Sequence, residues 1–342
     1  LRSSAHTMPE GQVRQVLTAA YGPDWQDLFA EFELTPMASA SIGQVHRAVA
    51  RDGREVAVKL QYPGVAESID SDVDNLRSLL RLARLVPSEL DLDALTDEVK
   101  AELRKEVDYE RELQQLLAYR DALGERPGLR LPQPHADLSR PRVLALELVP
   151  GVPLLTWGEH APQEQRDAVA TRLLELLATE LFDIGLMQTD PNPANYLYDA
   201  DREDLVLLDF GATREVPPDV ADLYRQAFSG IAARDEHRLR DVLLRLGIGG
   251  TAEDREASDI LIRVALEASE VLDEGGYDFA ASDLPERLQA LGKELRRYRT
   301  QLRPPPPAYL FFQRKLGGTF LLCRQLRART NGRAALRAAG AL

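Results

Sequence analysis

Hydrophobic and polar residues repeat with two different periods along the chain. In E-V-A-V-K-L, residues 55–60, every second residue is apolar, which is the period of a half-buried strand, and V-H-R-A-V-A, residues 45–50, is also rich in apolar residues. The turn Asp52-Gly53 lies between these runs and is a strong hairpin signal. Helical spacing of apolar residues is found in residues 12–21, 70–85, 93–123, 162–187, 219–234, 238–246, 252–272, 284–300 and 309–329. The pattern predicts a small antiparallel sheet and a larger, mostly helical region.

A polar turn follows the predicted helix over 162–187. It has the sequence D-P-N-P-A-N, and the next apolar segment ends in L-L-D-F-G. We expect a short hairpin here, with Asp190 and Asn195 before it and Asp209 after it. In phosphoryl transfer, such a first Asp orients the nucleophile's proton, while the Asn and the second Asp hold Mg²⁺ on the nucleotide phosphates. An acidic turn before a buried strand is the plainer interpretation, but the two motifs at this spacing favour the catalytic one.

A loop of small residues precedes the predicted hairpin, and a lysine lies on the hairpin's second strand. Small side chains let a loop backbone approach phosphates closely, and Lys59 is placed to reach the α- and β-phosphates of a nucleotide. The alternative is that Lys59 lies on the solvent face of an edge strand. The residues expected to bind nucleotide are Ala38, Ser39, Ala40, Ser41, Ile42, Gly43, Gln44, Val45 and Lys59.

Two further segments are expected to complete a nucleotide site. A helical Glu should pair with Lys59 and hold it in position, and we expect Glu106 in this catalytic role, with Glu112 on the same predicted helix as the second choice. The strand R-V-L-A-L-E-L-V ends at Pro150-Gly151, which predicts a linker between two lobes. By position alone, an adenine ring is expected to bind the backbone at Glu147 and Val149.

Composition narrows the class of protein. The net charge of −13 disfavours nucleic acid as a partner, because there is no surplus of positive charge to neutralise phosphates. The single cysteine, Cys323, excludes an internal disulfide, and its apolar surroundings predict a packed core thiol. The five histidines lack metal-ligand spacing, which disfavours zinc. Apolar runs are too short for a spanning helix.

Together these motifs resemble one family, the UbiB/AarF-type atypical kinases of the coenzyme Q branch. The resemblance starts at about Thr35 and rests on A-S-A-S-I-G-Q-V-H, on V-A-V-K-L-Q-Y-P-G-V, on Glu106-x-Asp108 with Glu112, on D-P-N-P-A-N with L-D-F-G-A-T-R-E, and on the tail P-P-P-P-A-Y-L-F-F-Q-R-K-L-G-G-T-F-L-L-C. The family's K-x-G-Q motif is not present, since Gly11-Gln12 follows Pro-Glu. Because the chain starts at Leu1 rather than Met, we expect this motif to lie upstream in a longer protein.

The resemblance implies an α+β, bilobal protein-kinase-like fold. We expect an N-terminal helical extension over residues 1–30, an N-lobe with a small antiparallel sheet and inserted helices over 31–149, and a larger, mostly helical C-lobe over 150–342. Gln188-Thr189 stands where ordinary kinases have His-Arg before the catalytic Asp, so control by activation-loop phosphorylation is not expected.

The resemblance also implies a function. We expect a Mg²⁺-dependent ATPase or atypical kinase that binds ATP or ADP and supports coenzyme Q metabolism. Isoprenoid-quinone lipids or quinone-biosynthesis proteins are the expected partners, in the cytoplasm or peripheral to the inner membrane. Two alternatives stay open: a true kinase of a protein or small molecule, and a lipid-binding pseudokinase scaffold that uses nucleotide as a switch.

Overall fold

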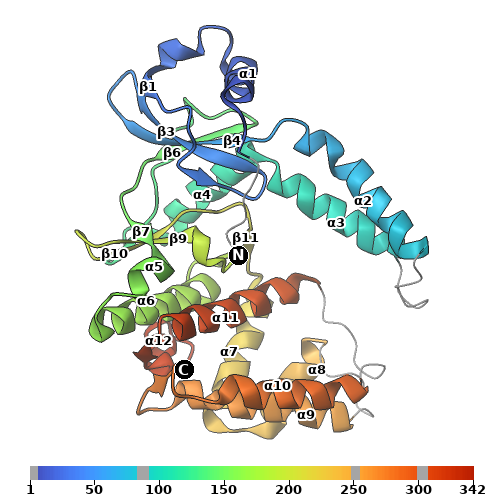
Figure 1. Cartoon of the computed structure of the whole chain (residues 1–342). Coiled ribbons are helices and arrows are strands. Elements are labelled where there is room, and N and C mark those ends of the chain that lie inside the picture. The colour runs from blue at the N-terminus through green and yellow to red at the C-terminus, as the bar shows by residue number, and fades with distance from the viewer. Residues whose placement is uncertain (1–6, 83–91, 248–254, 299–306) are drawn as a thin grey trace. The chain divides into compact units, whose positions relative to one another are not determined.

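The computed structural model describes residues 7–82, 92–247, 255–298 and 307–342 (Figure 1). The chain divides into two compact units, and each is formed by separate stretches of sequence. Unit 1 contains residues 1–121, 131–150 and 209–212, and unit 2 contains residues 122–130, 151–208 and 213–342. Among the described residues, no helix has both the length and the apolar character needed to cross a membrane.

Unit 1 is built on an antiparallel sheet of strand order β1-β3-β4-β6, with β2 added beside β3 (Figure 1). The predicted hairpin is confirmed, because β3 pairs with β4 in the register His46↔Val58. Gly53 in the connecting turn has φ +89°, a conformation that L-residues with side chains rarely adopt. The strands are β1 (Phe29–Phe32), β2 (Ala38–Ser39), β3 (Gly43–Ala50), β4 (Glu55–Gln61) and β6 (Val143–Glu147).

The core of unit 1 lies between this sheet and the first helix. Alternate residues of β4, Val56, Val58 and Leu60, are fully buried. They belong to one hydrophobic cluster with residues of α1 (Glu10–Tyr21) and with Trp25 of the short 3₁₀ helix η1 (Trp25–Leu28). The described part of the segment predicted as an extension is therefore an integral part of the unit's core.

Three helices follow β4: α2 (Val65–Leu82), α3 (Leu92–Glu106) and α4 (Tyr109–Leu123). The prediction of one continuous helix over 93–123 was wrong, because the chain breaks between α3 and α4. The side chain of Asp108 accepts a hydrogen bond from the backbone N–H of Arg111 at 2.9 Å, so it caps α4. The Val107 carbonyl accepts from the Gln61 side chain at 2.8 Å.

Unit 2 contains the hairpin predicted after the polar turn. Strand β9 (Tyr196–Asp199) pairs antiparallel with β10 (Asp204–Leu207) in the register Tyr196↔Leu207. The strand order of this sheet is β5-β10-β9-β7, with β5 (Leu129–Arg130) and β7 (Val152–Pro153) at its edges. A second, two-stranded sheet pairs β8 (Leu186–Gln188) with β11 (Thr213–Glu215).

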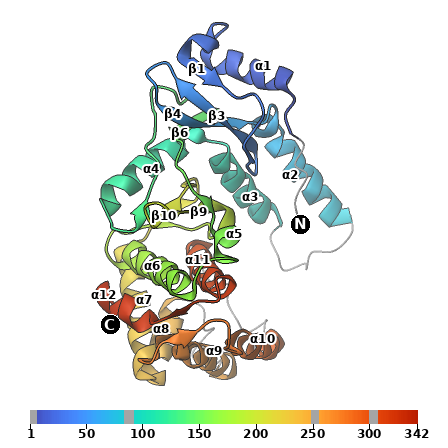
Figure 2. The same cartoon turned by 60° about the vertical axis from the view of Figure 1, so that its left-hand side comes forward.

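Helices form most of unit 2. The central helix α6 buries its apolar residues and contacts α11 and α12 (Figure 2). It ends at Phe182, before the predicted end at Met187, because Gly185 takes a left-handed conformation (φ +65°) and the chain then enters β8. The helices are α5 (Leu154–Gly158), α6 (Gln163–Phe182), α7 (Pro218–Ala233), α8 (Glu236–Arg245), α9 (Arg255–Glu267), α10 (Leu284–Leu295), α11 (Pro307–Gln325) and α12 (Gly332–Ala338).

Candidate active site

A cluster of one lysine and two carboxylates, of which Glu112 is buried, lies in unit 1. Lys59 Nζ donates to Glu112 Oε2 at 2.9 Å and to Glu112 Oε1 at 3.1 Å, and it lies 3.6 Å from Asp209 Oδ2. Strand β4 is flanked by β3 and β6, so Lys59 is on an interior strand. The alternative of a lysine on a solvent-exposed edge strand was therefore wrong. The side chains of Val56, Val58 and Leu60 point to the core face, and by strand alternation Lys59 points to the other face.

The predicted pairing of Lys59 with Glu106 was wrong, and the second choice, Glu112, is its partner. Glu106 is exposed at the end of α3, where it accepts a hydrogen bond from Ser41 Oγ at 2.8 Å. The break before Tyr109 is the reason, because it places Glu112 on the next helix rather than two turns along the same one. Helical spacing counted across that break cannot identify the partner.

The electrostatic environment keeps Lys59 charged. Burial by itself lowers the pKa of Lys59, but the Glu112 and Asp209 carboxylates outweigh this and raise that pKa above its ordinary value. Burial raises the pKa of Glu112 to about 7, against the lowering effect of the Lys59 ammonium. At slightly alkaline pH the Lys59 ammonium therefore faces an ionised Glu112 carboxylate.

Tyr109 is a member of this cluster that the sequence did not indicate. Its ring centre lies 4.9 Å from Lys59 Nζ, within the range of a cation–π contact. The Tyr109 side chain is almost fully buried, and burial raises the pKa of its hydroxyl. Its position directly after the E-x-D motif was the available signal.

The predicted small-residue loop is mostly a strand pair. Ala38 and Ser39 form β2 and pair with Gln44 and Val45 of β3, so the turn itself is residues 40–42. A Cβ on Gly43 would lie 2.2 Å from the carbonyl oxygen of Leu60 and 3.0 Å from Tyr109 Oη. Glycine is thus required at residue 43 by the close approach of the neighbouring strand.

Gln44 has a different role from the one expected. Its side chain is fully buried, accepts from the backbone N–H of Met8 at 2.9 Å and lies 2.9 Å from His46 Nε2. The side chain of Gln44 therefore ties the segment before α1 to β3, which leaves only its backbone for a nucleotide.

The D-F-G segment is held inside unit 1. Asp209 Oδ1 accepts from the Gly211 N–H at 3.0 Å, and Arg111 donates to the Gly211 carbonyl at 3.0 Å. The Phe210 ring packs against Tyr119, with ring centres 5.0 Å apart. These contacts fix the Asp209 carboxylate beside Lys59.

The other two predicted catalytic residues lie together in unit 2. Asn195 Nδ2 donates to Asp190 Oδ2 at 3.0 Å, and the Asn195 carbonyl accepts from the Leu208 N–H at 3.0 Å. Asp209 directly follows Leu208 in the chain. The Asp190 carboxylate also forms an ion pair through Oδ1 with Arg314 of α11, a contact that nothing in the sequence indicated.

The donor set fits a metal ion that is shared with a ligand. Among the described residues, no group of three or more His, Cys, Asp or Glu side chains is arranged to hold a metal by itself. Mg²⁺ typically takes one or two protein oxygens and completes its octahedron with phosphate oxygens and water. The Asn195 amide nitrogen is used by Asp190, so its side-chain oxygen is the group suited to a cation.

The expected residues, Glu147 and Val149, present their backbone groups on the outer edge of the strand predicted to bind adenine. The Leu148 N–H donates to the Glu55 carbonyl at 3.0 Å. Since hydrogen-bonding directions alternate along a strand, the backbone groups of Glu147 and Val149 point to the side away from β4. On that side the Glu147 N–H donates to the Gln133 carbonyl at 2.7 Å.

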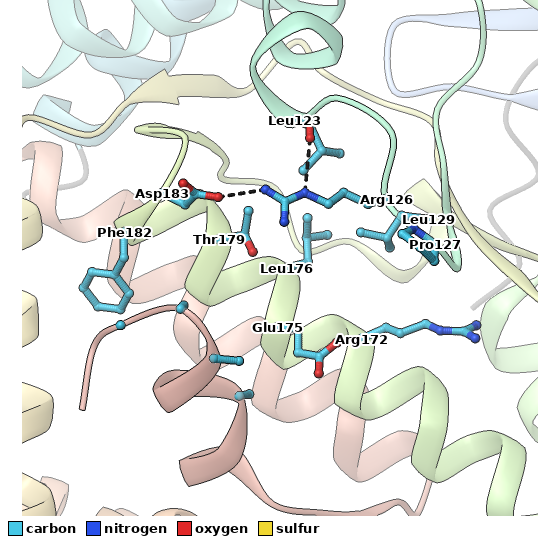
Figure 3. Close-up of a pocket in the computed structure, with 14 residues that line it drawn as sticks. Leu123, Arg126, Pro127, Leu129, Arg172, Glu175, Leu176, Thr179, Phe182 and Asp183 are labelled. Carbon is cyan, nitrogen blue, oxygen red and sulfur yellow. Dashed lines mark hydrogen bonds and ion pairs between the residues drawn. The ribbon is translucent and has the colours of Figure 1, made fainter.

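A separate cavity of about 490 Å³ lies in unit 2 (Figure 3). Segments of α6, α12 and residues 123–129 line it with both apolar and charged side chains. Arg126 crosses one side, where it donates to the Leu123 carbonyl and pairs with Asp183 at 2.7 Å. None of the predicted site residues lines this cavity.

Comparisons with known proteins agree with the motifs. Residues 1–243 match the protein family described as the ABC1 atypical kinase-like domain. The chain is 40% identical over 329 residues to the mitochondrial atypical kinase COQ8B of Rattus norvegicus, covering 96% of this chain and 62% of that protein. It is 32% identical over 332 residues to the mitochondrial atypical kinase COQ8 of Saccharomyces cerevisiae, covering 96% of this chain and 66% of the relative.

A solved structure is similar over nearly the whole chain. The protein Rv3197 of Mycobacterium tuberculosis, solved as a complex with erythromycin, matches with a TM-score of 0.76 and 27% identity, covering 97% of this chain and 83% of that one. The chain spans less than two thirds of the length of the curated rat and yeast relatives. The predicted α+β kinase-like fold is confirmed. The chain belongs to the ABC1 atypical kinase-like family.

Proposed function

We propose that this chain binds ATP with Mg²⁺ and hydrolyses it, as an atypical kinase-type ATPase. The observation that carries the proposal is the largely buried Lys59 ammonium held by Glu112 and Asp209. A buried cation that is already charged and oriented is suited to bind the α- and β-phosphates of a nucleotide. A lysine can also be buried in an ion pair that only stabilises the fold, but such a pair does not require an aspartate from a D-F-G segment.

Each residue of the proposed site then has one task. Glu112 holds Lys59 in place, and the backbone over residues 38–45 covers the phosphates. Asn195 and Asp209 are the protein ligands of Mg²⁺, which when bound neutralises phosphate charge. The Asp190 carboxylate orients a water or hydroxyl and takes up its proton.

The adenine position follows from strand β6. The Glu147 carbonyl and the Val149 N–H are the backbone groups proposed to bind the adenine edge. Their direction away from β4 supports this, because the inner edge of the strand is occupied by pairing with Glu55.

We further propose that turnover supports quinone-lipid metabolism at a membrane surface. The sequence resemblance to the coenzyme Q branch, including the F-F-Q-R-K-L-G-G-T-F-L-L-C helix, supports this proposal. With a net charge of −13, contact with an anionic membrane would have to be apolar or mediated by a partner.

ATP hydrolysis is the direct test. The wild type is compared with Asp209→Asn, and with Asp219→Asn as a matched control at an exposed aspartate of α7. Each protein is assayed with Mg²⁺, with and without liposomes that contain a quinone-like lipid. We expect hydrolysis that the lipid increases, that Asp209→Asn abolishes and that Asp219→Asn leaves unchanged.

Other results would favour the alternatives. Binding of Mg·nucleotide without turnover under either condition would favour a nucleotide-switched scaffold. A stoichiometric phosphorylated product would favour a true kinase. Absence of nucleotide binding would refute the site.

A further inference from the structure

Helix α11 carries a buried lysine that the proposed mechanism does not use. The Lys315 side chain is 2% exposed, and its Nζ lies 3.3 Å from Oε2 of Glu180, a fully buried carboxylate on α6. Nζ also donates to Gln188 Oε1 at 3.2 Å and to Tyr196 Oη at 3.3 Å. The buried ammonium therefore has a carboxylate at ion-pair distance and two hydrogen-bond acceptors, which compensate the cost of burying its charge. Burial lowers the pKa of Lys315, but Glu180 and Tyr196 outweigh this and raise it.

Two of these partners lie on either side of the catalytic turn. Gln188 precedes Asp190 by two residues, and Tyr196 directly follows Asn195. The Gln188 side chain donates to the Asp190 carbonyl at 2.8 Å, while the Gln188 N–H donates to Glu180 Oε1 at 3.0 Å. One ammonium thus contacts both ends of the turn, and through Gln188 it is linked to the backbone of Asp190.

Two more residues of α11 contact the same turn. Arg314 pairs with the Asp190 carboxylate. A Cβ on Gly318 would lie 2.1 Å from Pro191 Cγ, so the helix backbone packs directly against the proline that follows Asp190. Residues 314, 315 and 318 share one face of a helix. An ion pair that merely joined α11 to α6 would need none of these contacts.

We propose that Lys315 is a positioning residue for Asp190, acting through Gln188. The inference rests on the proposed function, in which Asp190 orients the attacking group. Gln188 and Thr189 occupy the two positions before Asp190, where ordinary kinases have His-Arg. The charge that holds the turn comes instead from a helix more than a hundred residues later in the chain.

Two variants separate positioning from stability. Gln188→Met breaks the link to the Asp190 carbonyl but keeps the Lys315–Glu180 pair. Lys315→Met combined with Glu180→Gln removes both charges together, so that neither is left buried without a partner. Arg324→Met is the matched control, because it removes only the exposed ion pair of the same helix with Glu286.

Steady-state kinetics and amide hydrogen exchange of residues 187–196 are measured for each variant. We expect kcat to fall about 100-fold in both positioning variants, since a displacement of ~1 Å at a catalytic group has an effect of this size. KM for ATP should stay within about threefold. A variant that carries Gln188→Met together with Lys315→Met and Glu180→Gln should lose no more kcat than either positioning variant. Exchange of the turn should speed up in both variants and stay unchanged in the control.

The inference is overturned if Gln188→Met melts at a lower temperature while its kcat and its exchange over 187–196 equal those of the wild type. If the charge-pair variant does not fold, Gln188→Met alone decides. A wild type that hydrolyses no ATP refutes the proposed function. In that case the exchange of the turn decides whether Lys315 orders it.

Discussion

Two adjacent glycines of α11 provide a matched test of how this helix packs. A Cβ on Gly317 would have no atom within 4 Å, whereas a Cβ on Gly318 would lie 2.1 Å from Pro191 Cγ and 2.3 Å from Pro191 Cβ. Replacement of each glycine by alanine adds one methyl group to the same helix. Any difference between the two variants therefore reports the contact with Pro191.

The magnitudes follow from these distances. Gly317→Ala should raise the free energy of unfolding by about 0.5–1 kcal/mol, the usual gain of alanine over glycine inside a helix. For Gly318→Ala, ordinary contact begins at 3.4 Å, so the turn must move by about 1.3 Å, which is 3.4 minus 2.1. Overpacking of this kind costs about 1–3 kcal/mol, which cancels or exceeds the helical gain. A shift of this size next to Asp190 should also lower kcat about 100-fold.

The two tryptophans allow the measurement to be confined to unit 2. Trp25 belongs to the core of unit 1, and Trp157 of unit 2 stacks on Tyr198 with ring centres 3.9 Å apart. In a Trp25→Phe background, urea unfolding followed by fluorescence reports unit 2 through Trp157. The two alanine variants are compared in that background, and ATP hydrolysis is measured on the same samples.

Equal effects of the two substitutions would refute the reasoning. If Gly318→Ala stabilises unit 2 as much as Gly317→Ala and keeps wild-type kcat, then α11 does not press on Pro191. If Gly318→Ala loses stability without any change in kcat, then the contact with Pro191 contributes to packing but does not place Asp190.

Three other predictions concern Glu112, Cys323 and His46. Glu112→Gln should lower ATP turnover about tenfold or more at a pH of about 8, because Lys59 loses its nearest carboxylate. Glu106→Gln should leave ATP turnover within about twofold of the wild type. Equal losses in the two variants would contradict the observed pairing of Lys59 with Glu112. Burial raises the pKa of the Cys323 thiol to about 12. A thiol reagent should therefore label the native protein far more slowly than the denatured protein. Equal labelling rates would show that the thiol is accessible. Burial lowers the pKa of His46 below 6.5, so the unfolded state binds a proton at a higher pH than the folded state, and stability falls as the pH drops below 6.5. Between about pH 7.5 and about pH 5.5, His46→Gln should therefore lose less unfolding free energy than the wild type. Parallel pH profiles of the two proteins would exclude a role of His46 in the pH dependence of stability.

The sequence was informative where short-range patterns decide the structure. The period-two alternation and the Asp52-Gly53 turn were sufficient for the hairpin that carries Lys59, and the motif spacing was sufficient for the hairpin after Asn195. In both, the turn chemistry and the apolar alternation act over a few residues. Family membership followed from the same motifs.

Longer-range features could not be predicted from such patterns. The break at Val107 depends on one cap by Asp108 and on one hydrogen bond from Gln61, and it decides which glutamate reaches Lys59. The partners of Lys315 lie far from it in sequence, and the lysine sits in an apolar segment with no local signal of a buried charge network. Tertiary contacts of this kind override local periodicity.

The division of the chain into interleaved stretches has a consequence for its synthesis. Residues 209–212 belong to unit 1, although the segments on both sides of them belong to unit 2. A nascent chain that has emerged only as far as Pro150 contains Lys59 and Glu112 but not Asp209. The cluster around Lys59 therefore gains its second carboxylate only after the ribosome has also made the β9–β10 hairpin. Two contiguous fragments cut at residue 150 would likewise leave each unit without part of its own sequence.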